Sequence, residues 1–183
     1  MTLTPPCFNI DTAPMDLNKL KALPVEAKAI YSKMIIQRFY IQEHGKVYVA
    51  YSGGKDSTVL LHLVRSLYPE VPAVFSDTGL EFPEIRDFVR ATPGVTIIRP
   101  DTSFRKVIED EGYPIVSKEV ANAICKARRG VPSALKLLDT PTSESRYGKA
   151  HYRHLLDAPF KISSKCCDRL KKAPFRTYEA ESG

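Results

Sequence analysis

Short apolar runs alternate with longer stretches of mixed polarity between residues 47 and 111. The apolar runs have the length of strands, whereas the stretches between them carry apolar residues at helical spacing. This pattern predicts strands at 47–51, 72–77 and 95–99 and helices at 57–67, 82–91 and 103–111. Such alternation is typical of parallel strands with crossover helices on both faces. We therefore predict an α/β fold with a doubly wound, mostly parallel sheet.

Two helices are expected ahead of the first strand. Residues 16–23 have one apolar face and end at Pro24, and apolar residues recur near helical spacing over 25–43. His44-Gly45 is typical of a helix end. Residues 1–14 are proline-rich and aperiodic, so we expect an extended arm there.

The pattern changes after Gly112. Residues 113–117 read as an extended link, and Ser117 is a suitable N-cap for a helix at 118–129. A polar, mobile loop is expected at 140–145, and further helices at 133–138, 146–158 and 164–172, the last ending before Pro174. The sequence thus predicts three parts: an N-terminal arm (1–24), an α/β core (25–112) and a helical, basic cap continuous with the core (113–183).

A glycine loop follows the first predicted strand, with the sequence Ser52-Gly53-Gly54-Lys55-Asp56-Ser57. The glycines let backbone N–H groups approach an anion, and the following helix adds the positive end of its dipole. Lys55 supplies a full charge, the serines supply hydroxyl donors, and Asp56 is placed to fix the loop or hold magnesium. We predict a phosphate site with Lys55 and Asp56 as catalytic residues. A plain strand-to-helix turn is the alternative.

A second polar segment follows the second predicted strand. Asp77 and Thr78 come at its carboxyl end, beside the glycine loop, where open α/β sheets bind ligands. Pro83 is suited to begin the next helix, with Glu84 in its first turn. We expect Asp77 and Thr78 to contact the ligand. The alternative is a loop with an Asx-turn before a capped helix.

Both segments resemble elements of one known family. Residues 52–57 resemble the SGGxDS signature of the PP-loop ATP pyrophosphatase superfamily, also called the adenine nucleotide alpha hydrolases. Residues 74–84 are similar to the DTG-x-x-FPE element of its phosphoadenosine phosphosulfate (PAPS) reductase family. The resemblance covers roughly residues 25–178. It implies a Rossmann-like fold, ATP or PAPS as ligand, Mg²⁺ as a companion of ATP, and adenine recognition by backbone groups near Phe75 and Ser76.

Residues 113–118 resemble a stretch near this position in reductase-family proteins. That resemblance implies that Lys118 contacts phosphate and that Arg128 and Arg129 line the same cleft. Plain surface charge is the alternative for all three.

A Cys-Cys pair is a third point of resemblance. Cys166-Cys167, with Lys172 and Pro174 behind them, match the frame of reductases that hold a four-iron, four-sulfur (4Fe-4S) cluster. The resemblance implies that the two cysteines are metal ligands, but the sequence has no Cys-x-x-Cys, so Cys7 or Cys125 would have to join them. Buried or idle thiols are the alternative.

Composition and charge restrict the compartment and the partners that we expect. The 183 residues suffice for a core without disulfides, and no apolar run reaches the ~20 residues of a membrane span. The cytoplasm is therefore the expected compartment. The formal net charge is +6, with acids concentrated at 70–111 and bases at 118–153 and 161–176. A polyanion, whether a nucleotide or a nucleic acid, would suit this basic half, although a solvated basic face is equally compatible. A partner protein or a homo-oligomer is also left open.

Three functions remain open from the sequence. The first is a PAPS reductase-like enzyme of sulfur metabolism that holds ATP or a sulfonucleotide in the glycine loop. Its thiol would have to come from elsewhere, because the Glu-Cys-Gly-x-His string of sulfonucleotide reductases does not occur in this sequence. The second is an adenylyltransferase or sulfurtransferase component that cleaves ATP between its α- and β-phosphates and acts on nucleic acid. The third is a non-catalytic accessory protein that binds nucleotide or nucleic acid.

Overall fold

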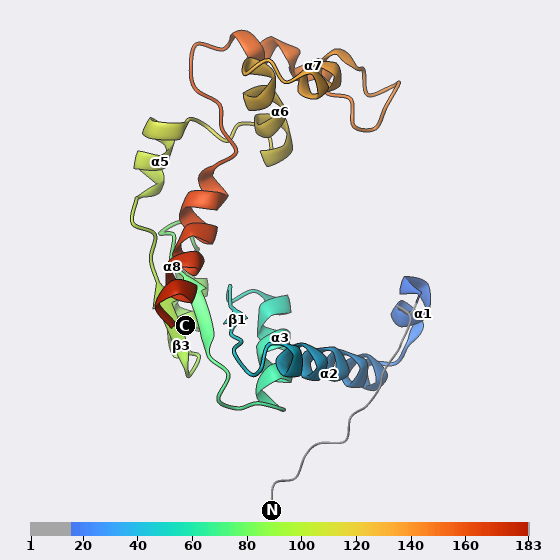
Figure 1. The fold of residues 1–183 in the computed structure, drawn as a ribbon, viewed down its shortest axis with the longest axis vertical. Helices are drawn as coiled ribbons and strands as arrows, with labels where there is room; N and C mark the ends of the chain where they lie inside the picture. The colour runs from blue at the N-terminus through green and yellow to red at the C-terminus, as the bar shows by residue number, and fades with distance from the viewer. Residues whose placement is uncertain (1–15, 183) are drawn as a thin grey trace, which may run out of the picture. The chain divides into compact units, whose positions relative to one another are not determined.

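The computed structural model describes residues 16–182. The first compact unit runs to Val47 and includes Val59–Val71, and the second comprises Tyr48–Thr58 and the chain from Pro72 onward. The predicted arm at 1–14 and Cys7 lie outside the described residues. The elements are, in order, α1 (Leu17–Ala22), α2 (Val25–Gln42), β1 (Val49–Ala50), α3 (Lys55–Arg65), β2 (Ala73–Ser76), α4 (Pro83–Ala91), β3 (Val95–Ile98), α5 (Phe104–Glu111), α6 (Lys118–Arg128), α7 (Pro132–Asp139), the 3-10 helix η1 (Ala150–Asp157), the π-helix η2 (Asp168–Lys172) and α8 (Ala173–Ser182) (Figure 1).

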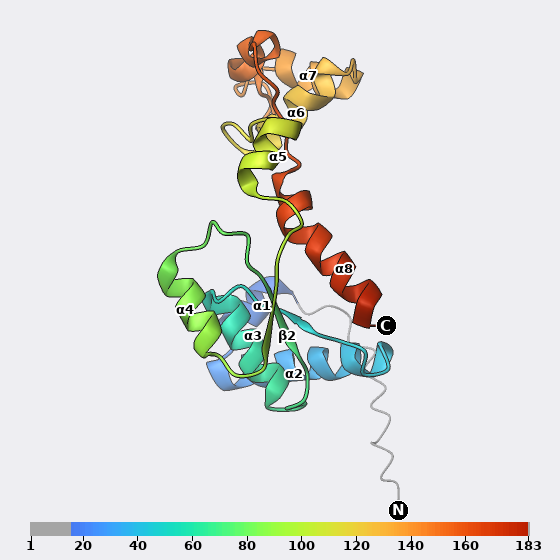
Figure 2. The ribbon, with the colours of Figure 1, turned by 90° about the vertical axis from the view of Figure 1, so that its left-hand side faces the viewer.

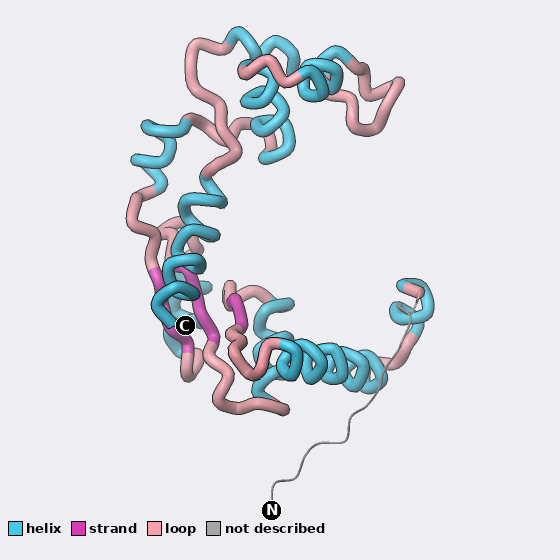
Figure 3. Tube along the Cα trace, viewed as in Figure 1, coloured by secondary structure: helices cyan, strands magenta, loops and turns pink. Residues whose placement is uncertain are grey.

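A small parallel sheet organises the second unit. Its strands lie in the order β1-β2-β3 (Figure 3). Val49 is opposite Ala73, and Ala73 is opposite Val95. The central strand is buried along its whole length, because it pairs on both sides and carries the apolar run Ala73-Val74-Phe75. The connections β1-α3-β2 and β2-α4-β3 each join parallel neighbours through a helix. The predicted α/β class is confirmed, with the predicted strands at 47–51 and 72–77 shortened to two and four residues.

The C-terminal helices share a separate apolar core. Helix α6 packs on α7, and η1 packs on both; α6 and α7 lie side by side in two perpendicular views (Figures 1 and 2). The core contains Val120, Ala121, Ile124, Ala127, Ala134, Leu138 and Ile162. The predicted helix at 146–158 is instead a 3-10 helix that begins at Ala150.

Arg128 holds this cap together. Its guanidinium donates to the carbonyl oxygens of Leu155, Leu156, Ala158 and Phe160 over distances of 2.8–3.0 Å. These are the carbonyls at the end of η1, where a helix leaves acceptors unpaired. Four of the five guanidinium N–H donors are therefore used by backbone oxygens, which supports a structural role for Arg128 rather than the predicted role of lining a phosphate cleft.

The sequence predicts that the last helix ends before Pro174, but in the structure the helix continues past this residue. Cys166 and Cys167 begin a helical segment that passes through η2 and continues as α8 to Ser182. Proline has no N–H to donate to the carbonyl four residues earlier, which here is Leu170. The wider turn of η2 accommodates the proline, and the Ser76 hydroxyl donates to the Leu170 carbonyl over 3.0 Å. Helix α8 also packs against β3.

The first unit contains α1, α2 and the end of α3. Helix α1 confirms the short helix predicted before Pro24, and α2 ends where His44 and Gly45 adopt positive φ angles of 52° and 77°. Tyr40 of α2 stacks on Tyr68 with ring centroids 3.7 Å apart and donates to Glu70 over 3.2 Å. Across residues 16–182, no helix is both long enough and apolar enough to cross a bilayer.

Candidate functional site

The glycine loop connects β1 to α3, as predicted, and Gly53 is its tightest point. Gly53 has a φ of +71°, and a Cβ at this position would lie 2.9 Å from a methyl group of Val89 and 3.0 Å from one of Ile85. Both residues belong to α4, so the loop rests directly on that helix. Only glycine satisfies both the left-handed backbone and the lack of space.

Hydroxyl groups brace the loop from within. The Ser57 hydroxyl accepts from the Ser52 N–H over 3.2 Å, lies 3.0 Å from the Ser52 hydroxyl and donates to the Gly54 carbonyl over 3.0 Å. Thr58 donates to the same carbonyl over 2.9 Å. The serines predicted as ligand donors thus also fix the shape of the loop.

The first turn of α3 presents donors for an anion. Its first intrahelical bond runs from the Thr58 N–H to the Gly54 carbonyl, so the N–H groups of residues 55–57 precede the hydrogen-bonded ladder. Lys55 and Asp56 are both exposed there. Backbone donors, the positive end of the helix dipole and a lysine are all present at this end of the helix, and phosphate sites commonly use these three features. Asp56 adds a carboxylate of the kind that holds Mg²⁺ beside phosphates.

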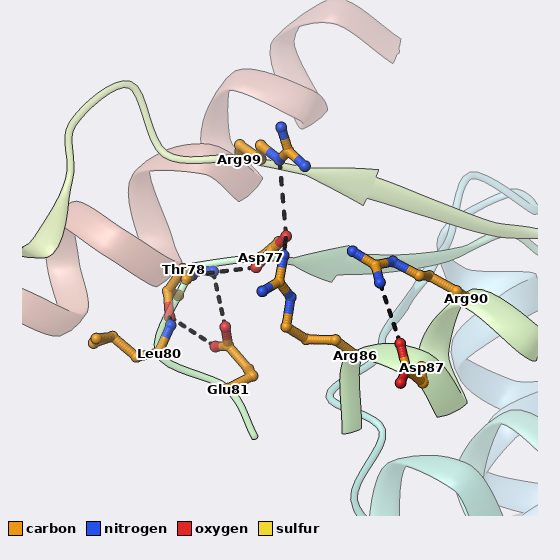
Figure 4. A network of polar contacts seen from close by, with 9 residues as sticks. Asp77, Thr78, Leu80, Glu81, Arg86, Asp87, Arg90 and Arg99 are labelled. Carbon is orange, nitrogen blue, oxygen red and sulfur yellow. Dashed lines mark hydrogen bonds and ion pairs between the residues drawn. The ribbon is translucent and has the colours of Figure 1, made fainter. Parts of the chain in front are cut away.

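Asp77 lies at the end of the neighbouring strand and is paired with two arginines. Its side chain is only 7% exposed, and the carboxylate oxygen Oδ2 lies 3.3 Å from Arg86 Nη2 and 3.8 Å from Arg99 Nε (Figure 4). The other oxygen accepts from the Gly79 N–H over 3.2 Å, which is the Asx-turn considered as the alternative. The structure therefore contains that turn and, in addition, a buried carboxylate between two guanidinium groups.

Thr78 is held by a local contact with Glu81. The Thr78 hydroxyl donates to one Glu81 carboxylate oxygen over 2.7 Å, and its N–H donates to the other over 3.1 Å. Phe75, in contrast, is a core residue with 3% exposure, so only its backbone is available to a ligand. Tyr51 donates its N–H to the Val74 carbonyl, which sets the start of the glycine loop level with the end of β2.

An open cavity adjoins Asp77. Its volume is about 440 Å³ and its walls are formed by Asp77, Thr78, Gly79, Arg86, Arg99, Pro100, Asp101, Thr102 and Ser103. Arg86 and Arg99 were not among the site residues predicted from the sequence. Arg99 is the first residue after β3, so its position at a strand end is the signal that was available.

Lys118 and the cysteine pair form a second group. Lys118 is the exposed first residue of α6, and its charge acts on both Cys166 and Asp168. Burial raises the pKa of the Cys166 thiol, the neighbouring Cys167 raises it further, and Lys118 opposes the change. The pKa of Asp168 is lowered, mainly by the hydrogen bond from Lys172, which lies 2.8 Å away.

The donor set for a metal cluster is incomplete within residues 16–182. There, no three side chains of the His, Cys, Asp or Glu type gather where a metal ion would bind, and Cys125, Cys166 and Cys167 are free thiols. A 4Fe-4S cluster usually needs four cysteine ligands. The described residues therefore do not fit such a cluster.

Comparison with known proteins identifies related sequences. Residues 46–142 match the model of the phosphoadenosine phosphosulfate reductase domain. A phosphoadenosine 5'-phosphosulfate reductase of Klebsiella pneumoniae is 34% identical over 41% of this chain and 36% of its own length. An adenosine 5'-phosphosulfate reductase of Mesorhizobium japonicum is 31% identical over 50% of this chain and 37% of its own. An uncharacterized protein of Methanocaldococcus jannaschii is 30% identical over 60% and 28%. The chain thus spans about a third of the length of these relatives.

Proposed function

Because the chain belongs to the phosphoadenosine phosphosulfate reductase domain family, we propose that it is an enzyme that binds an adenosine sulfonucleotide at the carboxyl ends of β1 and β2. The glycine loop, residues 52–57, would hold the phosphosulfate end. Asp77 and Thr78 would lie beside the nucleoside, with adenine against the backbone near Phe75. The names of two relatives support this ligand class, since both refer to adenosine phosphosulfates.

One observation carries the proposal. The loop between β1 and α3 combines a glycine that cannot be replaced without a clash, N–H groups of residues 55–57 ahead of the helical ladder, and the exposed cation of Lys55. This combination binds phosphate or sulfate oxygens. Catalysis by such a loop consists of positioning the ligand and neutralising its charge, with Lys55 as the cation and Asp56 at the loop.

A second candidate ligand is ATP with Mg²⁺. Reduction of a sulfonucleotide requires a thiolate, whereas burial raises the pKa of the Cys166 thiol and so disfavours its thiolate form. Cleavage of ATP between the α- and β-phosphates needs no protein nucleophile. Asp56 would then bind the Mg²⁺ that accompanies the phosphates, and the acceptor would be a separate molecule, for which nucleic acid remains a candidate through the basic C-terminal half.

Titration calorimetry separates the two candidates. The protein is purified anaerobically and titrated with PAPS and, separately, with ATP plus Mg²⁺, and sulfite and pyrophosphate are measured in the same samples. Binding of PAPS in preference to ATP supports the sulfonucleotide site. Preferred binding of ATP, with release of pyrophosphate, contradicts the sulfonucleotide site and supports ATP with Mg²⁺ as the ligand. If neither ligand binds, both are contradicted.

A further inference from the structure

The loop between α7 and η1 is held closely at its base. The N–H of Lys149 donates to the Leu137 carbonyl oxygen over 2.7 Å. A Cβ at Gly148 would collide with the carbonyl oxygens of Thr140 and Pro141, so the two ends of the loop lie in contact. The loop therefore keeps a defined shape, which fixes the position of the residues just before Gly148.

Arg146 and Tyr147, directly before this glycine, are exposed and lie against each other. Cζ of Arg146 lies over the Tyr147 ring at 5.3 Å from its centroid, and Tyr147 is 57% exposed. No carboxylate of residues 16–182 pairs with the Arg146 guanidinium, whereas the neighbouring Arg153 pairs with Asp139. The loop thus presents an unneutralised cation beside an accessible aromatic ring.

The buried Lys149 attaches this pair to the start of α6. Its Nζ donates to the Tyr147 carbonyl oxygen over 3.2 Å and lies 3.6 Å from Oε2 of Glu119. Glu119 follows Lys118, the exposed first residue of α6. Lys118 therefore lies at the same end of the cap as Arg146 and Tyr147.

The last helix adds cations to the same region. Lys172 pairs with Asp168 over 2.8 Å, and the charges of Lys118 and Arg176 act on the same carboxylate. Three cations thus surround one carboxylate and leave an excess of positive charge. We call Lys118, Arg146, Tyr147 and Arg176 the basic surface.

The positive charge of the chain is concentrated in this half. Residues 118–182 contain 14 lysines and arginines against seven aspartates and glutamates, whereas the whole chain has 27 against 21. The entire positive excess therefore lies in these residues. Such an imbalance attracts polyanions. An exposed aromatic ring among the cations offers, in addition, the π-face on which unpaired bases of nucleic acid stack.

From these observations, we propose that the basic surface binds single-stranded nucleic acid. The cations contact successive phosphates, and one unpaired base stacks on Tyr147 beside Arg146. In a duplex the bases stack on one another, so Tyr147 has no base to receive. The inference goes beyond the proposed function, because it does not depend on the nucleotide that the glycine loop holds. Single-stranded DNA and RNA share this chemistry, and the test separates them.

The test is fluorescence anisotropy of the full chain with a labelled strand of about 20 nucleotides, long enough to cross the surface. The strand is used as DNA, as RNA and as a DNA duplex of the same sequence, without added mononucleotide. We expect at least one single strand to bind roughly tenfold more tightly than the duplex, with an affinity that falls as salt rises. The tighter of the two strands identifies the kind of nucleic acid.

Tyr147→Ala should lower the affinity for the single strand roughly 5- to 100-fold, as expected for the loss of one stacked base. Tyr147→Phe keeps the aromatic ring and should bind within about twofold of the wild type. Phe39→Ala is the matched control, because Phe39 of α2 is 55% exposed, and this variant should bind like the wild type.

Arg146→Ala should reduce the slope of log affinity against log salt by about 0.7, the value expected for one phosphate contact to a single strand. Arg105→Ala is its control. The Arg105 side chain is 89% exposed and pairs with Glu109 on α5, and its removal should leave the slope unchanged.

Failure to bind either single strand at low salt would overturn the inference. Equal affinities for single strand and duplex, or equal affinities of Tyr147→Ala and Phe39→Ala, would also overturn it, because charge alone would then explain the binding. Each of these outcomes leaves the glycine loop untouched, since the calorimetry with PAPS and ATP tests that site independently.

Discussion

The hydroxyl of Ser76, the last residue of β2, donates a 3.0 Å hydrogen bond to the carbonyl of Leu170 in η2. Both residues are buried. The bond supplies the donor that Pro174 lacks, and it fixes the helix that carries Cys166 and Cys167 to the end of β2, directly before Asp77. The cysteine pair and the candidate nucleotide site are therefore joined through one side chain.

Ser76→Ala should lower the free energy of unfolding by about 1–3 kcal/mol, since it leaves a buried carbonyl without a donor. Ser66→Ala removes an exposed hydroxyl that donates to the carbonyl of Leu63, and it should cost less than about 0.5 kcal/mol. Denaturant unfolding of both variants makes the comparison. Equal stabilities would mean that the Ser76 hydrogen bond does not hold the helix.

Gly53→Ala should destabilise the protein more than Gly130→Ala. Both glycines have φ near +75°, at 71° and 78°, but a Cβ at residue 130 meets no atom within 4 Å, whereas one at residue 53 meets Val89 at 2.9 Å. The left-handed backbone costs about 1 kcal/mol at either position. The clash at residue 53 should add about 1–3 kcal/mol. Thermal unfolding measures the difference, and similar losses at the two positions would contradict the close packing of the loop on α4.

Arg128→Ala should loosen the helical cap. The guanidinium serves four carbonyl oxygens, and partial exposure of the group reduces the cost of its loss to about 1–3 kcal/mol. The neighbouring Arg129 gives a single bond to the Cys125 carbonyl, at 3.3 Å, so Arg129→Ala is the control. Amide hydrogen exchange in α6 and η1 should increase in the first variant and remain unchanged in the second. If nucleotide affinity also fell in Arg128→Ala while exchange stayed unchanged, the assigned structural role would be wrong.

Glu111 should make stability depend on pH. Hydrogen bonds from Lys165 and Arg169 lower the pKa of its carboxyl, and the two cations lie 2.8 Å and 2.7 Å from its oxygens. A lowered pKa in the folded state contributes stability above the ordinary carboxyl value of about 4.3, and this contribution is lost as the pH falls through the folded pKa. Because both cations are more than half exposed and solvent screens the pairs, Glu111→Gln should cost about 0.5–1 kcal/mol at pH 7. The melting temperatures of wild type and variant should converge in acid, and a constant difference down to pH 2 would contradict this role.

The sequence was sufficient for the local features of the site. The glycine loop, the helix after it and Asp77 at the end of β2 were predictable because each depends on neighbouring residues and on the period of the apolar pattern. The pairing of Asp77 with Arg99 was not, since it depends on the register of β2 against β3. The structural role of Arg128 was not predictable because its four acceptors lie about thirty residues further along the chain. The helix through Pro174 was missed because the compensating donor is Ser76.

The central claim is that the loop at residues 52–57 binds the phosphate or phosphosulfate end of an adenine nucleotide. Its most direct test is calorimetric titration of the wild type, Lys55→Ala and Lys136→Ala with adenosine 3',5'-bisphosphate. Lys136 is an exposed residue of α7 and serves as the charge-matched control. We predict that Lys55→Ala lowers the affinity at least about tenfold with an unchanged melting temperature, while Lys136→Ala binds like the wild type. Unchanged affinity in Lys55→Ala, or equal losses in the two variants, would contradict the assignment of this loop.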